Sequence, residues 1–368
     1  MMQPKPDLDD LRSSCTRFLN GHGARTPKVV LSEIHDELGE VGIDRYGEGG
    51  VVAELEEEVG ALLGKPAAVF MPSGTMAQQI ALRVHVERTG REVVLWHPTC
   101  HLQLHEGQGA ERLHHIRPRT VGDARRLLTI DDLEDVAEYA GVLLLELPQR
   151  EIGGQLPGWG DLVAQTELAR SHGTALHLDG ARLLESLPHY GRSAAEVAEL
   201  FDSVYLSLYK GLGGLAGCVL AGDEQLVAEA KEWRLRHGGR LFAMWPYAAA
   251  GLAGLRRRAP LMSAYAEHAK AVSAELVELD RVSVVPDPPV TNMAHLYLRA
   301  DLERFASATR DLAHKERIWT WGGGVPADMP SHLVVEMTVG DATMDLAPAE
   351  VREIIAGLLE RSQPDQTA

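Results

Sequence analysis

Lys210 is the residue in this sequence best suited to covalent chemistry. It follows the apolar run 203–208 and precedes glycines at 211, 213 and 214. An amine in apolar surroundings favours its neutral form and can form a Schiff base with an aldehyde. A lone lysine at a strand end more commonly extends its amine to solvent. Taken alone, Lys210 is compatible with both roles.

An acidic residue closes a second apolar segment. Asp179 follows the run 174–178 and is followed at once by Gly180. A carboxylate at a buried strand end is costly unless a cationic group requires it. Asp179 is therefore a candidate partner for a positively charged group.

Two hydroxyls and a glycine lie at a third junction, between an apolar run and a helical pattern. Ser73, Gly74 and Thr75 follow the run 67–71. The free N–H groups of a helix N-terminus, a glycine that permits close approach and two hydroxyls suit a phosphate group. The alternative is an ordinary N-cap, in which Ser73 or Thr75 satisfies the first amides of the helix.

A cluster of histidines supports a different hypothesis. His97, His101 and His105 are spaced four residues apart, with Cys100 adjacent. Histidines at this spacing can share a helix face and bind a metal ion, which would indicate a metal-binding protein. The segment lacks the HExxH pattern, and Pro98 disrupts a helix through His97.

Considered together, the first three segments predict a pyridoxal phosphate site. The cofactor requires a phosphate cradle, a carboxylate that keeps its pyridine nitrogen protonated and a lysine that holds its aldehyde. The sequence supplies them in that order, ending with Asp179 and Lys210.

These residues need a sheet whose strands end at one edge. Short apolar runs alternate with helical patterns, such as 51–64 and 73–90, over about 200 residues. This alternation predicts a mainly parallel sheet with helices on both faces. Ligands bind beyond the carboxyl ends of such strands, where the candidate residues lie. The predicted strands are 67–71, 92–96, 142–147, 174–178, 203–208 and 217–221.

The pattern changes after residue 255. A long helix at about 260–279, strands near 281–298, a helix at 301–314, a strand at 332–339 and a final helix from 347 predict a smaller α+β domain. We expect a large domain at 29–255 and a small C-terminal domain at 256–368. Residues 1–28 are too few for a domain and are expected to pack on the small domain or on a partner subunit.

Composition excludes several classes of protein. The 368 residues include 36 Lys and Arg against 53 Asp and Glu, a formal net charge of −17. Such an acidic chain lacks the basic face that a non-specific nucleic-acid binder needs. There is no apolar run long enough to span a membrane, no secretory signal at the N-terminus, and three scattered cysteines form no disulfide framework. A cytoplasmic protein is expected.

The sequence resembles the L-threonine aldolase / β-eliminating lyase family of fold type I pyridoxal phosphate enzymes. The segments that carry the resemblance fall within residues 29–255. They are RYGEGGVVAELE (45–56), ALLGKPAAVFMPSGTMAQQIAL (61–82), ALHLDGARL (175–183), DSVYLSLYKGLGG (202–214) and AAAGLAGL (248–255). The resemblance implies a fold type I α/β architecture, pyridoxal 5'-phosphate as the cofactor, and a homodimer or homotetramer with shared active sites.

The resemblance also implies roles for individual residues. Lys210 would carry the cofactor, Asp179 would pair with its pyridine nitrogen, and His101 would stack on its ring. The remaining cofactor residues would be Ser73, Gly74, Thr75, Arg182, Ser207 and Arg240, and the substrate residues Ser13, Tyr46, Gln149 and Arg317.

The sequence departs from the family pattern at substrate-binding positions. Gln149 stands where the family's ENTHN motif has a second active-site histidine, and Phe242 stands where a phosphate-binding arginine is typical, with Arg240 two residues away. The strand that usually supplies an arginine for the substrate carboxylate offers Glu336; Arg317 and Arg25 are the candidate replacements.

The expected reaction is the cleavage, or formation, of a β-hydroxy-α-amino acid such as threonine, giving glycine and an aldehyde. His101 or His105, or a water molecule held by either, is the candidate base for the β-hydroxyl proton. β-Elimination or other chemistry on an amino acid with the same lysine is the alternative within the class. A metal-binding protein that uses His97, His101 and His105 is the alternative outside it.

Overall fold

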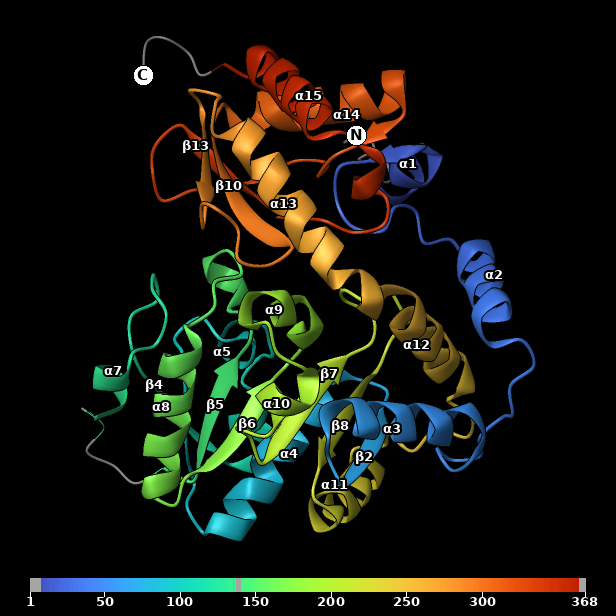
Figure 1. The fold of residues 1–368 in the computed structure, drawn as a ribbon, viewed down its shortest axis with the longest axis vertical. Coiled ribbons are helices and arrows are strands. Elements are labelled where there is room, and N and C mark those ends of the chain that lie inside the picture. Colours follow the sequence, from blue (N-terminus) through green and yellow to red (C-terminus); the bar gives the residue numbers. More distant parts are fainter. Residues whose placement is uncertain (1–7, 135, 137–139, 364–368) are drawn as a thin grey trace, which may run out of the picture. The chain divides into compact units, whose positions relative to one another are not determined.

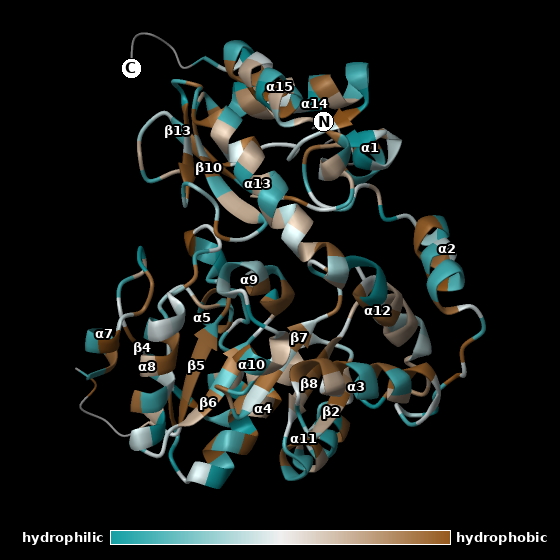
Figure 2. Cartoon of the chain, viewed as in Figure 1, coloured by the Kyte–Doolittle hydropathy of each residue, from teal (hydrophilic) through white to brown (hydrophobic). Residues whose placement is uncertain are grey.

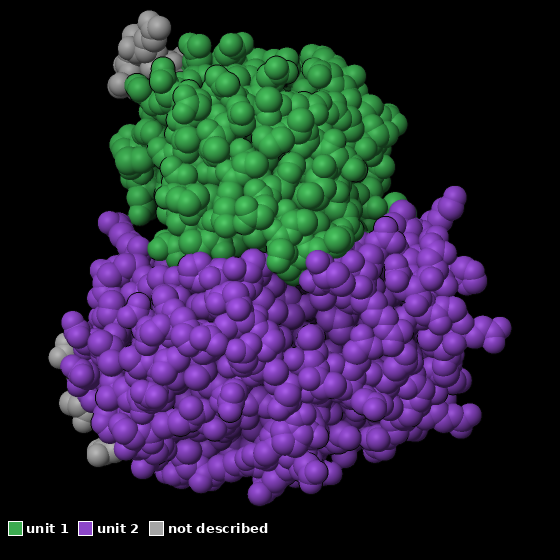
Figure 3. Space-filling view, viewed as in Figure 1, with its two compact units in different colours: residues 1–27, 153–155, 261–368 green, residues 28–152, 156–260 purple. Residues whose placement is uncertain are grey.

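The chain forms two compact units in the computed structural model, which describes residues 8–134, 136 and 140–363. Unit 1 comprises residues 1–27, 153–155 and 261–368, and unit 2 comprises residues 28–152 and 156–260 (Figure 3). Residues 1–7 of the expected N-terminal segment lie outside the described residues.

A seven-stranded sheet forms the centre of unit 2 (Figure 1). Its strand order is β2-β8-β7-β6-β5-β3-β4, and β8 runs antiparallel to both of its neighbours while β3 to β7 are parallel. The strands are β2 (Ala67–Met71), β3 (Val93–Trp96), β4 (Arg117–Thr120), β5 (Val142–Glu146), β6 (Ala175–Asp179), β7 (Ser203–Ser207) and β8 (Cys218–Gly222).

Helices cover both faces of this sheet, which explains why its central strands are apolar on both sides. Side chains alternate between the faces of a strand. On β2, Val69 and Met71 pack in one cluster with α4 (Gly74–Thr89) and α11 (Glu224–Arg236), whereas Ala68, the residue before Val69, lies against Gly60 of α3 (Gly50–Leu63). The apolar colouring of β5 in Figure 2 matches four buried residues from Val142 to Leu145.

The helices of unit 2 vary from one to more than four turns. They are α2 (Pro27–Leu38), α3 (Gly50–Leu63), α4 (Gly74–Thr89), α5 (His101–His105), α6 (Gly109–His114), α7 (Ile130–Glu134), α8 (Trp159–Ser171), α9 (Leu183–Tyr190), α10 (Ala194–Ala198), α11 (Glu224–Arg236) and α12 (Trp245–Arg258), with short 3₁₀ helices at Arg150–Ile152 and Ala259–Leu261. Among the described residues, no helix is long and apolar enough to span a membrane.

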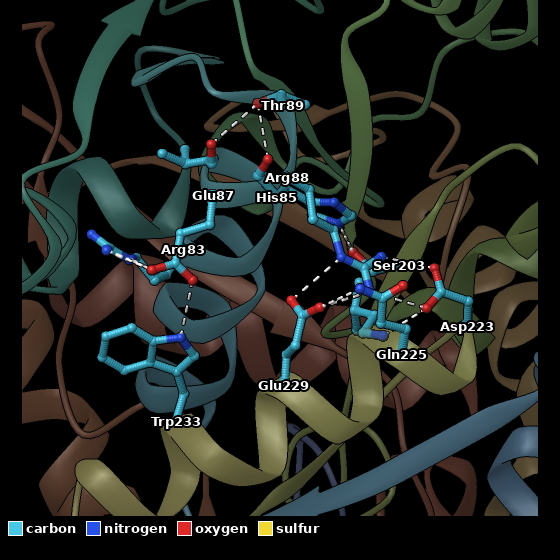
Figure 4. Close-up of polar contacts among 12 residues, drawn as sticks. Arg83, His85, Glu87, Arg88, Thr89, Ser203, Asp223, Gln225, Glu229 and Trp233 are labelled. Atoms are coloured by element: carbon cyan, nitrogen blue, oxygen red, sulfur yellow. Dashed lines mark hydrogen bonds and ion pairs between the residues drawn. The ribbon is translucent and has the colours of Figure 1, made fainter.

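A chain of buried polar side chains fixes α4 against the sheet. His177 on β6 lies 2.6 Å from Gln78 Oε1 through Nε2 and 2.7 Å from Ser203 Oγ through Nδ1. His85 Nε2 reaches the same hydroxyl at 2.7 Å, as Figure 4 shows. Burial lowers the pKa of His177 to about 3 and that of His85 to about 4, so both rings are neutral near pH 7. Because Gln78 Oε1 can only accept, the neutral His177 donates through Nε2, its Nδ1 accepts from Ser203, and Ser203 accepts from His85.

Unit 1 is built on an antiparallel sheet of order β12-β13-β10-β9. Leu296 of β10 and Val335 of β13 are register partners, and both are buried. A short parallel pair, β1 and β11, joins the N-terminal residues to this unit. Its elements are α1 (Leu8–Ser14), β1 (Arg17–Phe18), α13 (Met262–Leu276), β9 (Val282–Val285), β10 (Met293–Arg299), α14 (Leu302–Glu316), β11 (Ile318–Trp319), β12 (Val325–Pro326), β13 (His332–Thr338) and α15 (Pro348–Arg361), with a 3₁₀ helix at Thr343–Asp345.

The expected fold class is confirmed: unit 2 is an α/β layer structure with a mainly parallel sheet, and unit 1 mixes helices with a small antiparallel sheet. The predicted strands of the large sheet are present within one or two residues. One strand of that sheet, β4, was not predicted, because its sequence, RPRT, has no apolar residue beyond Pro118.

Candidate active site

Three ionisable residues lie at neighbouring strand ends of unit 2. Glu146 ends β5 and Asp179 ends β6, and the two are register partners. Lys210 follows β7, the next strand of the sheet. The sheet therefore brings the predicted lysine and aspartate together, with a second carboxylate beside them.

Burial decides the charge balance between Lys210 and Asp179. Asp179 is 1% exposed, and burial raises the pKa of its carboxyl while the charge of Lys210 opposes the shift. Burial lowers the pKa of the Lys210 amine, and Asp179 opposes that shift in turn. A lysine with a lowered pKa is neutral, and hence nucleophilic, in a larger share of molecules near neutral pH.

The Lys210 side chain lies in a pocket at this edge of the sheet. Arg182, the residue before α9, and His101, the first residue of α5, line it together with Lys210. Both belong to the predicted set of cofactor residues. The full lining is His101, Glu146, Leu147, Pro148, Arg150, Glu151, Ala181, Arg182 and Lys210.

The N-terminus of α4 has free hydrogen-bonding groups. Ser73 is the N-cap residue, yet its side chain makes no capping hydrogen bond, contrary to the ordinary N-cap alternative. A Cβ on Gly74 would lie 2.3 Å from the Tyr205 hydroxyl, so only glycine fits there without displacement. Thr75, next in the helix, is exposed.

Ser207 supplies a buried hydroxyl near this helix end. It pairs with Cys218 on β8, whose Sγ lies 3.5 Å from the Ser73 carbonyl oxygen. Its Oγ is buried and makes no hydrogen bond of normal geometry within the described residues, although it interacts with the Tyr205 side chain. Uncommitted hydroxyls beside a helix N-terminus fit a phosphate group.

Two histidines each lie beside a carboxylate, and one member of each pair, His101 and Glu151, lines the pocket. His101 Nδ1 lies 3.4 Å from Glu106 Oε1, and His105 Nε2 lies 2.9 Å from Glu151 Oε1. The ring centroids of the two histidines are 5.2 Å apart. Arg150 also contacts Glu151 Oε1, at 2.7 Å. The pocket lining and the side chains in contact with it thus combine groups that can accept a proton with the guanidinium group of Arg150.

Gln149 belongs to a separate chain of hydrogen bonds. Its Nε2 donates to Thr99 Oγ1 at 3.2 Å, and Thr99 Oγ1 lies 2.9 Å from His97 Nδ1. His97 Nε2 reaches two backbone carbonyls, of Asp123 and Arg126, each at 2.9 Å. Since carbonyls only accept, His97 carries its proton on Nε2, and the Thr99 hydroxyl donates to Nδ1. Both nitrogens of His97 are occupied.

The metal-binding alternative is not favoured by this geometry. Besides the hydrogen bonds of His97, the residue lies outside α5, which begins at His101. In the part of the chain that the structure describes, no three histidine, cysteine, aspartate or glutamate side chains are arranged to hold a metal ion.

Other predicted residues lie elsewhere in the single chain. Tyr46, 47% exposed, packs edge-to-face on Phe242 with the centroids 5.4 Å apart, and the Arg240 guanidinium lies 5.3 Å from the Tyr46 ring centre. None of these three lines the pocket of Lys210 within the described residues. Ser13 and Arg317 belong to unit 1, where both are exposed.

Three residues of the pocket lining were not predicted from the sequence: Glu146, Arg150 and Glu151. Glu146 closes an apolar strand just as Asp179 does, and this was the available signal. Arg150 and Glu151 form a 3₁₀ helix, and no pattern in the sequence indicates that this turn faces a lysine 60 residues further along.

Comparisons with known proteins place the chain in a family. The family model described as beta-eliminating lyase matches residues 33–301. A low specificity L-threonine aldolase of Escherichia coli (strain K12) is 32% identical over 273 residues, which cover 73% of this chain and 80% of that protein.

Solved structures extend the similarity to nearly the whole chain. A Listeria monocytogenes protein assigned as an L-allo-threonine aldolase is 38% identical, with a TM-score of 0.89, and the match covers 96% of this chain and 98% of that one. An Exiguobacterium protein assigned as an aromatic amino acid β-eliminating lyase/threonine aldolase gives the same identity and TM-score over 95% and 99% of the two chains. A match of this extent leaves no large part of the described fold unaccounted for, and the chain belongs to the β-eliminating lyase family of fold type I pyridoxal phosphate enzymes.

Proposed function

We propose that this protein is an aldolase that cleaves, or forms, a β-hydroxy-α-amino acid such as threonine, with glycine and an aldehyde as the other reaction partners. The observation that carries the proposal is that Lys210 lies beside Asp179 at adjacent strand ends, close enough for the charge of Asp179 to act on its amine, and shares a pocket with His101 and Arg182. The relatives named as threonine aldolases support the reaction.

The residues fit pyridoxal phosphate. Lys210 would hold the cofactor, Asp179 would keep its pyridine nitrogen protonated, and Ser73 to Thr75, with Ser207, would bind its phosphate. When bound, the cofactor provides a sink for the electron pair that is released when the Cα–Cβ bond breaks. Arg182 presents a guanidinium group for an oxygen of the cofactor or substrate.

A side chain of the protein must accept the proton of the substrate's β-hydroxyl group. His101 lines the pocket, and His105 reaches it through Glu151, so either histidine can accept the proton directly or through a water molecule. Gln149, in place of a histidine, can form hydrogen bonds to the substrate but cannot take up a proton near neutral pH.

β-Elimination is the second candidate function, and the family model and the assignment of the Exiguobacterium protein favour it. The two reactions leave different products. The purified protein should release glycine from a panel of β-hydroxy amino acids. Release of pyruvate from β-substituted amino acids, without glycine release from any β-hydroxy amino acid, would overturn the aldolase proposal.

Reduction with borohydride tests the lysine. Peptide mapping of the reduced holoenzyme should give a pyridoxyl adduct on Lys210, and Lys210→Ala should lack the visible absorbance of the bound cofactor. Lys65→Ala is a matched control, because burial also lowers the pKa of Lys65, but its Nζ donates to the Phe201 carbonyl at 2.6 Å. An adduct on Lys65 or any other lysine would contradict the assignment.

We also propose a homodimer or homotetramer with shared active sites. An exposed aromatic pair, Tyr46 and Phe242, supports it, since Phe242 is 62% exposed and aromatic side chains are enriched at protein–protein interfaces. In this assembly a shared active site would include four residues that do not line the pocket of Lys210 in the described part of the single chain: Ser13, Tyr46, Arg240 and Arg317. A fully active monomer in sedimentation and dilution experiments would refute the proposal.

The domain division and the location are proposals of the same kind. The two compact units support a large domain at 29–255 and a small one at 256–368, with residues 1–28 joining the latter. The three cysteines are free and buried, which supports a reducing, cytoplasmic location.

A further inference from the structure

A second carboxylate lies beside Asp179, and the proposed function gives it no role. Glu146 ends β5 in register with Asp179 and lines the pocket of Lys210. An acidic side chain in this position is costly unless its oxygens are satisfied. The partners of Glu146 therefore indicate what it does.

Both oxygens of Glu146 accept hydrogen bonds from backbone amides. The His101 N–H donates to Oε2 at 3.2 Å, and the Arg150 N–H donates to Oε1 at 3.2 Å. His101 is the first residue of α5, and Arg150 is the first of the 3₁₀ helix Arg150–Ile152. One carboxylate thus ties two separate segments to the end of the sheet.

These two segments carry much of the pocket's polar lining. His101 belongs to the first, and Arg150 and Glu151 belong to the second. A displacement of about 1 Å in such groups can reduce a rate about 100-fold. The hydrogen bonds of Glu146 are therefore placed to control the reaction through the groups that they hold in position.

The charge of Glu146 also acts on its neighbours. Burial, and then the charge of Asp179, raise the pKa of Glu146 to about 7, while Lys210 opposes the shift. The two carboxyl groups are adjacent, so ionisation of one raises the pKa of the other. Loss of the Glu146 carboxylate therefore makes Asp179 easier to ionise and removes a negative charge near Lys210.

We propose that Glu146 is a positioning residue of this site: it holds His101 and the Arg150–Ile152 turn around Lys210 and, through its charge, influences the protonation of Asp179 and of the Lys210 nitrogen. This inference rests on the proposed function of Lys210. It assigns a role to a carboxylate that the proposed function leaves without one.

Two substitutions separate the two effects. Glu146→Gln keeps the size of the side chain but removes its charge and turns an amide donor toward one of the two backbone N–H groups. Glu146→Asp keeps the charge but shortens the side chain by one carbon. Glu56→Gln is the matched control: Glu56 is also partly buried with a raised pKa and accepts from the Phe70 N–H at 2.7 Å, away from the pocket.

The first measurement is amide hydrogen exchange in the cofactor-free protein. Overlapping peptides that contain His101 and Arg150 should exchange about 10-fold faster or more in both Glu146 variants, because the glutamine replaces one acceptor by a donor and the shorter aspartate does not reach both amides. Glu56→Gln should leave these peptides unchanged. Wild-type exchange in both Glu146 variants would overturn the positioning role.

The second measurement is a pH titration of the visible absorbance of the holoenzyme. The midpoint should move to lower pH in Glu146→Gln, because a negative charge that favours the protonated Lys210 nitrogen is lost, and should stay in place in Glu146→Asp and Glu56→Gln. In Glu146→Gln, kcat should fall about 10- to 100-fold while KM changes less than about 3-fold. An unshifted midpoint in that variant would overturn the electrostatic role.

Failure of the proposed function gives a different result. In that case the wild-type protein itself develops no visible absorbance with pyridoxal phosphate, whereas the exchange experiment still reports on Glu146. A wild-type protein with normal absorbance and activity, matched by Glu146→Gln in exchange, midpoint and kcat, would overturn this inference alone.

Discussion

The two buried histidines of unit 2 make stability depend on pH in a way that can be calculated. His85 is 3% exposed and His177 is fully buried. Burial lowers the pKa of His85 to about 4 and that of His177 to about 3. In the unfolded chain each would titrate near 6.5. Below pH 6.5 these histidines bind protons in the unfolded state but not in the folded state. The free energy of unfolding therefore falls as the pH falls from 6.5 towards 4.

The size of the effect follows from the shift of His85. Between pH 7.5 and 5.0 the unfolded histidine gains most of a proton while the folded one gains little, which costs about 2 kcal/mol of unfolding free energy. His177 contributes a similar amount over the same range. The loss applies in full because both side chains are shielded from solvent.

The perturbation is His85→Gln, whose side-chain amide can still donate to Ser203 Oγ but does not titrate. Urea unfolding of the cofactor-free protein at pH 7.5 and 5.0 gives the loss of stability in each variant. Wild type should lose about 2 kcal/mol more than His85→Gln between these pH values. The carboxyl groups contribute equally to both proteins and cancel in the comparison.

A control variant makes the comparison specific. His35→Gln removes an exposed histidine on α2 and should not reproduce the effect. If wild type and His85→Gln lose the same free energy between pH 7.5 and 5.0, His85 is not held neutral by burial, and the hydrogen-bond directions assigned to the chain are wrong.

Two other substitutions test packing around the site. Gly74→Ala should weaken the affinity for pyridoxal phosphate at least about 10-fold in a fluorescence titration, because the added methyl group overlaps the Tyr205 hydroxyl. Gly160→Ala, on α8 with open space around its Cα, should bind like wild type; equal affinities in all three proteins would contradict the reasoning. Asp44→Ala should lower the unfolding free energy by about 2–4 kcal/mol, since the buried carboxylate accepts from three backbone N–H groups, two of them at the start of α12. A loss below about 0.5 kcal/mol in urea unfolding would show that water replaces the carboxylate as the hydrogen-bond acceptor of these N–H groups.

The fold was predictable where burial leaves a trace in the sequence. A strand covered on both faces must be apolar, so β5 and β7 appear as continuous apolar runs. β4 is at the edge of the sheet and pairs with β3 alone, and its arginines are exposed or half-buried. An edge strand needs no apolar residues and is often charged, so periodicity could not reveal it.

The site was predictable only in part, for a related reason. Lys210 and Asp179 stand out because a charged residue at the end of an apolar run has a cost that the sequence itself reveals. The contacts of Glu146 with the His101 and Arg150 amides join segments that are far apart in the chain. Such contacts depend on how the strands are ordered in the sheet, and a local pattern does not contain that information.

The hydrogen bonds of Gln149 bear on the proposed proton transfer. Thr99 gives its own proton to a neighbouring histidine, so its oxygen must accept from the Gln149 amide nitrogen, and the orientation of that amide is fixed. A fixed, neutral amide can orient a substrate group but cannot remove a proton from it. Under the proposed function, the groups that can do so are His101, which lines the pocket of Lys210, and His105, which lies 2.9 Å from Glu151 and whose ring is 5.2 Å from that of His101. If the proposed aldolase function holds, the base is one of these histidines and not Gln149, which does not line the pocket of Lys210 within the described residues. Substitution of His101 or His105 should therefore change the pH dependence of kcat, and substitution of Gln149 should not.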